Sequence, residues 1–399
     1  MNIVGLRWVF KTKLKADGSI ERFKAWLVAK GYNQIEGVDF DDTFSPVVKA
    51  TTIRLVLAVA TTLHWSIKQL DVKNAFLHGD LIETVFIEQP PGFVDPNYPV
   101  HVCRLKKALY GLKQAPKAWF HKFSTHLLHL GFICSKSDSS LFVWKSSKDT
   151  ILLLLYVDDI VLTGGSPFLL HALILNLKSK FAMKDMGDLH YFLGIEVTRC
   201  KDGLFLCQRK YALDVLERTK MACARAIHTP FAQKHELYEP QGYPIDPSGF
   251  RSIVSALQYL TLTRPDLSHA VNLLCQFVQH PVATHWAGVK RVLQYLAGST
   301  KLGLHITLCS SLNVVGFSDA DWGGCPLTRR STTGLCVFLG SNYVSWASKK
   351  QTTMARSSAE AEYRALASLA AEITWLTYIL RDIGVSLPNL GQYFSSSPH

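Results

Sequence analysis

The stretch ILLLLYVDDIVLT, residues Ile151–Thr163, decides the fold of the first half of this chain. Two apolar runs flank the acidic pair Asp158 and Asp159, and this pattern predicts a strand, a tight turn and a second strand. Such a turn displays two carboxylates that repel each other unless a cation lies beside them. An isolated Asp-Asp pair is most often an ordinary turn. Because side chains alternate along a strand, we expect only Asp158 to point squarely at a shared metal ion.

A third carboxylate, Asp71, follows the strand-like run Ile67–Leu70 and precedes the helix-like Asn74–Phe76. Carboxylates from neighbouring strand ends can hold two Mg²⁺ ions about 4 Å apart, which is the arrangement for in-line phosphoryl transfer. Ligands that are all oxygen, without a His or Cys cluster, favour Mg²⁺ over zinc, with Mn²⁺ as a substitute. Asp71 and Asp158 are therefore the expected partners in a metal site.

Outward from these acids, the spacing of apolar residues predicts alternating helices and strands. Trp8–Gly31 has the pattern of a hairpin with a basic face. Helical spacing is found over Thr51–Trp65, and a second helix is expected over Pro116–Leu130, because proline favours a helix start. We expect these elements to form an α+β domain that ends near Thr198.

The rest of the chain has a different character. The proline-rich segment His228–Gly249 predicts a linker or an extended crossing strap. Three amphipathic helices are expected after it, with apolar stripes at Ile253/Leu257/Leu260, Leu267/Val271/Leu274/Val278 and Trp286/Val289/Leu293/Leu296. Strands are expected around Val314–Ser318, Gly334–Leu339 and Tyr343–Ala347, and then a helix over Ser357–Ile383.

Composition limits the class of function. Lys and Arg exceed Asp and Glu by 43 to 31, a net charge of +12, so a polyanion such as nucleic acid is a more natural partner than an acidic protein, and a membrane surface is the weaker alternative. No apolar run approaches ~18 residues and no cleavable leader opens the chain, which disfavours membrane spanning and secretion. Nine cysteines without a CxxC pair predict reduced thiols rather than a zinc site. We expect an intracellular protein.

Longer motifs give a more specific indication. LDVKNAFLHGDL (70–81), QPPGF (89–93), LKKALYGLKQAPKAW (105–119), YVDD (156–159) and FAMKDMGDLHYFLGIEV (181–197) occur in this order. Together they resemble the reverse transcriptase of copia-type LTR retrotransposons. The later TRPD (263–266), GFSDADWGGC (316–325), RRSTTG (329–334), SWASKKQ (345–351) and SSAEAEYRAL (357–366) resemble the ribonuclease H region of the same Pol polyproteins. The resemblance extends roughly from Leu6 to Gly384.

This resemblance implies a right-hand polymerase with fingers, palm and thumb, followed by an incomplete ribonuclease H-like α/β domain. It implies fingers and palm over residues 1–227, a linker with a helical thumb or connection over 228–311, and a C-terminally truncated ribonuclease H-like region over 312–399. Asp71, Asp158 and Asp159 match the family's catalytic acids. The backbone carbonyl of Val72 would be a further metal ligand.

The resemblance also implies a site for an incoming dNTP. Phe76 matches the aromatic position that excludes a ribose 2′-hydroxyl, although a phenylalanine here is as readily a core residue. Gln114 matches a residue that contacts the nucleotide. The finger motif reads KAWLVAKG where the family reads KARLVAKG, so Trp26 replaces an expected arginine. Lys24 is then the cation that would compensate for it.

Other matching residues concern the nucleic acid strands. Lys113 and Lys117 lie four apart near a helix start and could meet phosphates, although a solvated basic face is the more common explanation. Phe192–Gly194 resembles the primer-grip turn, where Gly194 would let the backbone approach the primer strand. The implied partners are an RNA template, a DNA primer and dNTPs.

Two acids match the ribonuclease H motifs. Asp319 follows a strand-like run. On the later helix, Glu362 shares a face with the apolar residues, whereas Glu360 lines up with Arg364. Glu362 is therefore the expected metal-facing acid.

The C-terminal segment predicts that this second site is incomplete. A two-metal site of this kind needs about four carboxylates, and residues 385–399 contain none. We expect no ribonuclease H activity and no strand after the last helix. Without that strand, the apolar face of the helix at Leu376 and Ile379 would be left uncovered.

Three functional classes remain in view. The first is an RNA-directed DNA polymerase, acting in a cytoplasmic particle or the nucleus, which the intact acids, Phe76 and Gln114 favour. The second is a catalytically impaired retroelement remnant that only binds nucleic acid, which Trp26 and the missing terminal acids favour. A nuclease without polymerase activity ranks last, because it would need acids that the ribonuclease H-like region lacks.

Overall fold

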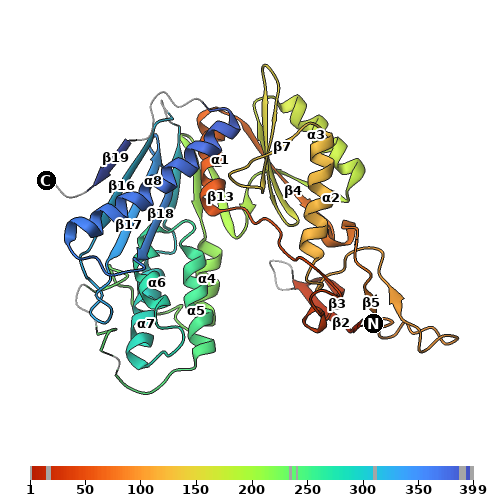
Figure 1. Ribbon diagram of the computed structural model, residues 1–399, viewed down its shortest axis with the longest axis horizontal. Helices are drawn as coiled ribbons and strands as arrows, with labels where there is room; N and C mark the ends of the chain where they lie inside the picture. Colours follow the sequence, from red (N-terminus) through yellow and green to blue (C-terminus); the bar gives the residue numbers. More distant parts are fainter. Residues whose placement is uncertain are drawn as a thin grey trace. The chain divides into compact units, whose positions relative to one another are not determined.

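The computed structural model describes residues 2–14, 19–232, 236–239, 241–308, 312–385 and 392–395 (Figure 1). The chain divides into two compact units. The first consists of Met1–Val48 and Lys68–Gly187, and the second of Lys49–Ile67 and Asp188–His399. Each unit mixes helices with β-sheets, in agreement with the mixed α and β character expected from the sequence.

The first unit is organised by a six-stranded sheet with the order β11-β4-β10-β9-β8-β7. Its strands are β4 (Ser66–Val72), β7 (Ile133–Cys134), β8 (Leu141–Lys145), β9 (Thr150–Tyr156), β10 (Asp159–Gly164) and β11 (Met183–Asp188). The remaining elements are β1 (Ile3–Val4), β2 (Leu6–Leu14), β3 (Ile20–Ala29), η1 (Gly31–Asn33), η2 (Ala75–His78), β5 (Phe86–Ile87), β6 (Cys103–Arg104), α2 (Ala115–His129) and α3 (Pro167–Lys180).

Helices α2 and α3 cover one face of this sheet (Figure 1). Alternate residues of β9, such as Leu153 and Leu155, pack in one core with Trp119 and Phe123 of α2 and with Leu170 of α3. The residues between them on β9 are also buried, as the continuous apolar run in the sequence requires. The predicted strand–turn–strand at Ile151–Thr163 is therefore confirmed, with β9 and β10 antiparallel.

The predicted N-terminal hairpin is formed by β2 and β3, which pair antiparallel from Leu6 opposite Ala29 onward. The sequence predicts the turn of this hairpin at Ala16-Asp17-Gly18-Ser19, and the first three of these residues lie outside the described residues. The base of the hairpin packs against the loop before α2. Gly111 makes this approach possible, because its φ is 92° and a Cβ there would lie 2.1 Å from the carbonyl oxygen of Ala29.

The second unit contains two four-stranded sheets and most of the helices. Its first sheet has the order β12-β13-β14-β15 and its second has the order β18-β17-β16-β19. The strands are β12 (Tyr191–Phe192), β13 (Ile195–Cys200), β14 (Gly203–Cys207), β15 (Gly303–Thr307), β16 (Val314–Ala320), β17 (Thr332–Leu339), β18 (Asn342–Lys350) and β19 (Gln392–Ser395). The helices are α1 (Ala50–Thr62), α4 (Arg209–Arg218), α5 (Pro247–Leu260), η3 (Pro265–Leu267), α6 (Ser268–Cys275), α7 (Ala283–Gly298) and α8 (Ser358–Ile383).

Helix α1 belongs to this second unit although it lies early in the sequence. Residues 52–60 are buried on every side of the helix, which is typical of a helix inside a protein core rather than on its surface. Strands β15 and β18 pack against it. A separate core joins α4, α5, α6 and α7, with Phe250, Leu274 and Leu293 among its fully buried side chains.

Several sequence-based expectations need correction. The α+β domain was expected to end near Thr198, but β13 runs through this residue as an inner strand of its sheet. The apolar stripe predicted to reach Val278 belongs to a shorter helix, α6, which ends at Cys275. Helices α3 and α4 were not predicted, although Ser166 and Pro167 at the start of α3 form a helix-start signal that could have identified it.

The end of the chain also differs from expectation. Strand β19 follows α8 and pairs in parallel with β16, Val315 opposite Gln392. The prediction that no strand would follow the helix is therefore wrong. The predicted uncovered face is wrong as well, because Leu376 and Ile379 are fully buried. The strand has only four residues, Gln-Tyr-Phe-Ser, and is too short to show the apolar alternation that would have identified it.

The helices, the cysteines and the surface charges bear on the function classes that the composition suggests. No described helix combines the length and apolar composition needed to cross a membrane.

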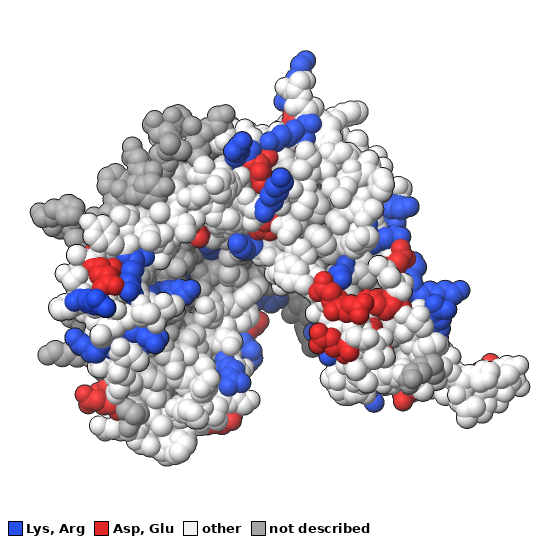
Figure 2. Space-filling model, viewed as in Figure 1, with Lys and Arg blue, Asp and Glu red and all other residues white. Residues whose placement is uncertain are grey.

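The eight cysteines among the described residues are free thiols, as predicted, and Cys309 lies outside these residues. On the face shown in Figure 2, Lys and Arg occupy several separate places with Asp and Glu among them. Net charge by itself thus does not single out one binding surface.

Candidate active site

The acidic turn of the first unit consists of Val157 and Asp158, between β9 and β10. Asp159 pairs directly with Tyr156, so only two residues connect the strands. Tight hairpins of this kind need a positive φ, and Val157 has a φ of 53°, which is unfavourable for a β-branched residue. The turn is held from α2, where Trp119 Nε1 donates a hydrogen bond to the Val157 carbonyl oxygen at 2.6 Å. The surrounding structure therefore fixes a strained conformation that displays the carboxylates.

Strand β4 brings Asp71 beside this turn. β4 and β10 are neighbours in the sheet, and the Val72 amide donates a hydrogen bond to the Asp158 carbonyl oxygen at 2.8 Å. The strand ends at this point, because Asn74 turns the backbone with a φ of 52° and starts η2. The three acids predicted from the sequence thus lie together at one edge of the strands.

The electrostatics of the three carboxylates are unfavourable as they stand. Burial, and then the charges of Asp158 and Asp71, raise the pKa of Asp159 to about 6. Burial raises the pKa of Asp158 as well, its own backbone amide opposes this, and Asp71 raises it further. Half-buried acids whose pKa values are raised by burial and by neighbouring carboxylates are the arrangement that a bound cation would relieve.

The donor set therefore suits a divalent cation in charge and chemistry. Its side-chain donors are carboxylate oxygens, which Mg²⁺ and Mn²⁺ prefer as ligands. Among the described residues, however, no three His, Cys, Asp or Glu side chains are already arranged as one metal-ligand group. The structure accordingly shows the acids gathered at one place, and it shows no preformed coordination sphere in the part of the chain that it describes.

An aromatic pair lies next to the acids. Phe76 is on η2, directly after Asp71 in the chain, and its ring centroid lies 4.8 Å from that of Tyr110. Burial, followed by the charges of Asp158 and Asp71, raises the pKa of the Tyr110 hydroxyl. Tyr110 is thus a neighbour of the acids that sequence reasoning missed, although it lies inside the LKKALYGLKQAPKAW motif.

Gln114 occupies a different environment from the acids. Its side chain is only 1% exposed. Gln34 Nε2 donates to its Oε1 at 2.9 Å, and its Nε2 donates to the Asp39 carbonyl oxygen at 2.8 Å. In this structure Gln114 fixes the loop that follows η1. Its predicted contact with a nucleotide stays a prediction.

The two lysines beside Gln114 contact the same loop. Lys113 Nζ lies 4.6 Å from the centroid of the Phe40 ring. Lys117 forms a 3.2 Å ion pair with Asp42. The Phe44 amide and then Lys117 hold the pKa of Asp42 below its usual range. A phosphate of a nucleic acid strand would have to compete with these internal contacts. The phosphate contacts predicted for both lysines stay a prediction.

Lys24 and Trp26 project from the same face of β3, since they are two residues apart on a strand. Lys24 Nζ lies 5.4 Å from the centroid of the Trp26 ring, within the range of a cation–π contact. Trp26, which stands where the family motif has arginine, therefore contacts Lys24, the lysine that was expected to compensate for that arginine.

The remaining predicted residues lie in the second unit. Leu193 and Gly194 form the turn between β12 and β13, with φ values of 48° and 68°. Tyr259 Oη of α5 donates to the Leu193 carbonyl oxygen at 2.5 Å. A Cβ at Gly194 would lie 3.2 Å from the Tyr259 ring. Glycine thus allows this hairpin to approach α5.

Asp319 and Glu362 belong to β16 and α8. Glu362 Oε1 accepts a hydrogen bond from the Ala320 amide at 3.3 Å, so Glu362 lies against the strand that carries Asp319. Glu360 instead pairs with Arg364 at 2.6 Å on the same helix. The Arg356 amide, and then Arg364, lower the pKa of Glu360. The helix therefore presents Glu362, and not Glu360, to the sheet.

Comparisons with known proteins are consistent with this arrangement. The reverse transcriptase (RNA-dependent DNA polymerase) family model matches residues 1–233. The retrovirus-related Pol polyprotein from transposon RE1 of Arabidopsis thaliana is 49% identical over 388 residues, which are 97% of this chain and 26% of that polyprotein. The corresponding polyprotein from transposon TNT 1-94 of Nicotiana tabacum is 39% identical over 393 residues, which are 95% of this chain and 29% of that polyprotein.

A transposon Ty5-1 protein of Saccharomyces cerevisiae is 30% identical over 308 residues, which are 76% of this chain and 100% of that protein. The chain spans about a quarter of the length of the Arabidopsis polyprotein. The family match includes the acidic turn, β4 and the aromatic pair. The chain therefore belongs to the reverse transcriptase (RNA-dependent DNA polymerase) family and resembles the copia-type, retrovirus-related Pol polyproteins of plant transposons.

Proposed function

We propose that this chain is the RNA-directed DNA polymerase part of a retrotransposon Pol polyprotein, with an RNA template, a DNA primer and dNTPs as its substrates. The observation that supports it best is the group formed by Asp71, Asp158 and Asp159, whose raised pKa values at Asp158 and Asp159 indicate a site suited to a cation. In the reaction, the primer 3′-oxygen forms a bond to the α-phosphorus of the dNTP. The bond from that phosphorus to the β-phosphate oxygen breaks, and pyrophosphate leaves.

In this proposal each nearby residue has a defined task. Asp71, Asp158 and the Val72 carbonyl would hold the divalent ions, which supply charge neutralisation for the attacking oxygen and the leaving group. Asp159 adds negative charge next to them. Trp119 keeps the turn in place through its bond to Val157.

We further propose that Phe76, supported by the Tyr110 ring, lies under the sugar and excludes a 2′-hydroxyl. Phe76→Ala should then admit ribonucleotides about 10- to 100-fold better relative to dNTPs. Phe76→Tyr keeps the ring and should retain the discrimination. Equal discrimination by the parent and Phe76→Ala would show that Phe76 is a core residue only.

We propose a right-hand arrangement for the fold. The β2–β3 hairpin would belong to the fingers and the six-stranded sheet to the palm, within residues 1–227. Residues 228–311, with α5, α6 and α7, would form the strap and thumb or connection. Residues 312–399 would form a ribonuclease H-like region, which the helix-covered β16–β18 sheet supports.

A primer-extension assay on the purified chain tests the polymerase proposal. With a DNA primer annealed to RNA, we expect extension with dNTPs and Mg²⁺ and none when a chelator removes the metal. Asp71→Asn should abolish the product. Asp149→Asn is the matched control, because Asp149 lies in the turn between β8 and β9, at the far end of β9 from the acids. Extension that survives Asp71→Asn would contradict the assignment.

A second candidate function is a retroelement remnant that binds nucleic acid without polymerising. The Lys24–Trp26 contact favours it, because a ring replaces the guanidinium expected near the triphosphate. The same assay separates the two. Binding of a primer–template duplex without any extension would favour the remnant.

We propose that the chain has no ribonuclease H activity. Asp319 and Glu362 are the two acids that the family motifs place at this site, and two carboxylates do not offset the charge of two divalent ions. The test is hydrolysis of the RNA strand of an RNA–DNA hybrid with Mg²⁺ or Mn²⁺. Cleavage by the parent that is absent from Glu362→Gln would contradict this proposal.

A further inference from the structure

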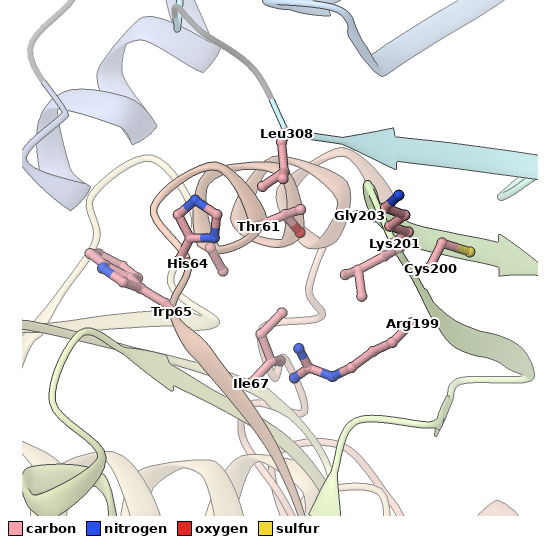
Figure 3. A pocket seen from close by; sticks show the side chains of 11 residues that line it. Thr61, His64, Trp65, Ile67, Arg199, Cys200, Lys201, Gly203 and Leu308 are labelled. Atoms are coloured by element: carbon pink, nitrogen blue, oxygen red, sulfur yellow. The ribbon is translucent and has the colours of Figure 1, made fainter.

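A pocket in the second unit is lined by none of the residues to which the proposed function gives a task. It is formed by the end of α1, by the β13–β14 turn and by Leu308, which follows β15. His64, Arg199 and Lys201 supply basic groups to its lining, and Ile67 and Leu204 supply apolar surface. We call this the basic pocket. Figure 3 shows the Arg199 side chain extended into it toward Ile67, with His64 on the opposite side.

The local structure fixes both sides of the basic pocket. β13 and β14 are closed by the pair Cys200–Gly203, which leaves Lys201 and Asp202 in the turn. The Leu308 amide donates to the Asp202 carbonyl oxygen at 2.9 Å and anchors this turn. Gly203 is required, because a Cβ there would lie 2.0 Å from the Ile306 carbonyl oxygen. The basic groups are thus presented by a hairpin with a defined position.

The other side depends on an unusual residue at the end of α1. His64 has a φ of 55°, and the next amide, of Trp65, donates back to the Ala60 carbonyl oxygen at 2.8 Å. Glycine is the usual residue at such a helix end, because a side chain disfavours this conformation. Here the position carries an imidazole that lines the pocket. A strained position that holds a polar side chain in a pocket indicates a function for that side chain.

The charges of the lining favour an anion. None of the described residues that line the basic pocket is acidic. Asp188 lies 3.9 Å from Arg199, but both side chains are about half exposed, so this ion pair holds the guanidinium weakly. A guanidinium offers paired donors that match two oxygens of one phosphate group, and an ammonium and an imidazole can add further donors. A carboxylate would use fewer of these donors.

We propose that the basic pocket binds a phosphate group. The proposal rests on the proposed function only for the source of that phosphate, which we take to be the backbone of a bound nucleic acid. A free phosphate compound, such as the pyrophosphate that polymerisation releases, has the same chemistry and is the other source. Binding can be measured without catalysis, so a failure of the polymerase proposal would leave this test intact.

The test compares two double variants of the full chain. Arg199→Gln with Lys201→Gln removes two positive charges from the basic pocket. Lys145→Gln with Lys148→Gln removes two from exposed positions at the β8–β9 turn of the first unit. Thermal unfolding should be the same for both variants. Affinity for a fluorescent RNA–DNA hybrid is then measured by anisotropy over a series of salt concentrations.

We expect the pocket variant to bind the hybrid at least about 5-fold more weakly at low salt. The slope of log affinity against log salt should fall by about 0.9 for each phosphate that the variant no longer neutralises. The control variant should change far less. Arg199→Lys with an intact Lys201 keeps the charge without the paired donors, so it should lie between the parent and the pocket variant. Equal weakening in the pocket and control variants would overturn the proposal, because the effect would then be one of net charge.

Pyrophosphate alone, titrated by calorimetry, distinguishes the two sources. If the pocket variant no longer binds pyrophosphate while hybrid binding is unchanged, the phosphate comes from a free compound and the pocket assignment stands. If only hybrid binding falls, the source is the nucleic acid backbone. If both ligands bind the pocket variant as they bind the parent, the proposal is wrong.

Discussion

The two units differ in how they surround a buried charge, as the Arg54 guanidinium and the carboxylates of the acidic turn show. In the second unit, Arg54 of α1 is 6% exposed, and its guanidinium donates to the carbonyl oxygens of Val344 and Leu262 at 2.7 and 2.8 Å. It also stacks 3.8 Å from the centroid of the Trp346 ring. Burial lowers the pKa of Arg54 to about 9, and the charge of Glu372 opposes this shift. The protein itself provides partners for this cation.

In the first unit, Asp158 and Asp159 are half-buried beside a third acid, and burial, followed by the nearby negative charges, raises their pKa values. The comparison teaches that a buried charge with partners inside the protein stabilises the fold. Buried charges that repel one another instead indicate a site for a bound ion of opposite charge. Removing a carboxylate of the acidic turn should therefore lower activity without lowering stability. Removing the Arg54 guanidinium should lower stability.

The largest effect is expected for Asp158→Asn. It removes a metal ligand, so primer extension should fall at least about 10³-fold. It also removes one of the repelling charges, so the free energy of unfolding without metal should stay the same or rise. Single-turnover extension and denaturant unfolding of the same preparation measure both. A variant that loses stability together with activity would break the comparison.

Next in size is Arg54→Met. This change leaves the Val344 and Leu262 carbonyl oxygens without their donor and Glu372 without its opposite charge, so the free energy of unfolding should fall by about 2–4 kcal/mol. Arg251→Met, at an exposed position of α5, is the control and should change it by less than about 0.5 kcal/mol. Urea denaturation measures both. Similar values for the two variants would mean that Arg54 adds nothing beyond a surface arginine.

A pH dependence should follow from Asp159. Its folded pKa of about 6 exceeds the ordinary value of 3.8, so its contribution to stability is complete below about pH 4 and is lost as the pH rises through 6. At pH 7.5 without metal, the free energy of unfolding of Asp159→Asn should exceed that of the parent by about 1–2 kcal/mol, after allowance for partial exposure. The variant should therefore be the more stable protein. The difference should disappear near pH 4 and shrink when Mg²⁺ is added. A gain that is equal at both pH values would show that the carboxylate is not destabilised by its neighbours.

The smallest effect is expected at the edge of the first unit, for Trp26→Arg. A guanidinium can form a charge-assisted contact with a triphosphate, and Lys24 would be released from the Trp26 ring. We expect the KM for dNTP to fall a few-fold, roughly 1 kcal/mol at this partly exposed position, with little change in kcat. Steady-state extension over a range of dNTP concentrations measures this. Identical KM values would show that the position is structural.

The acidic turn could be predicted from the sequence because its determinants are local. Two apolar runs around Asp158 and Asp159 specify a hairpin through the two-residue period of a strand, and β9 and β10 form it. The helix that carries Trp119 and Phe123 was predicted for the same reason, from its spacing and its proline. The choice of Glu362 over Glu360 followed from helix geometry and agreed with the family motif, and Glu362 lies against β16.

What the sequence could not show depends on contacts between distant segments. The burial of Gln114 is decided by Gln34 and Asp39, roughly eighty residues away, so no local pattern distinguishes a nucleotide contact from an internal bond. Tyr110 reaches the acids only because its loop packs against β3.

The sequence by itself determined that this protein has a displayed acidic hairpin, amphipathic helices and the motifs of a reverse transcriptase, because side-chain periodicity and short motifs lie within one element. Only the tertiary structure decided that α1 belongs to the second unit, that Arg54 is enclosed there, and that β19 completes the last sheet. It also decided how far Asp159 is from its ordinary pKa. Burial and charge interactions are sums over neighbours from the whole chain, so they exist only once the chain has folded.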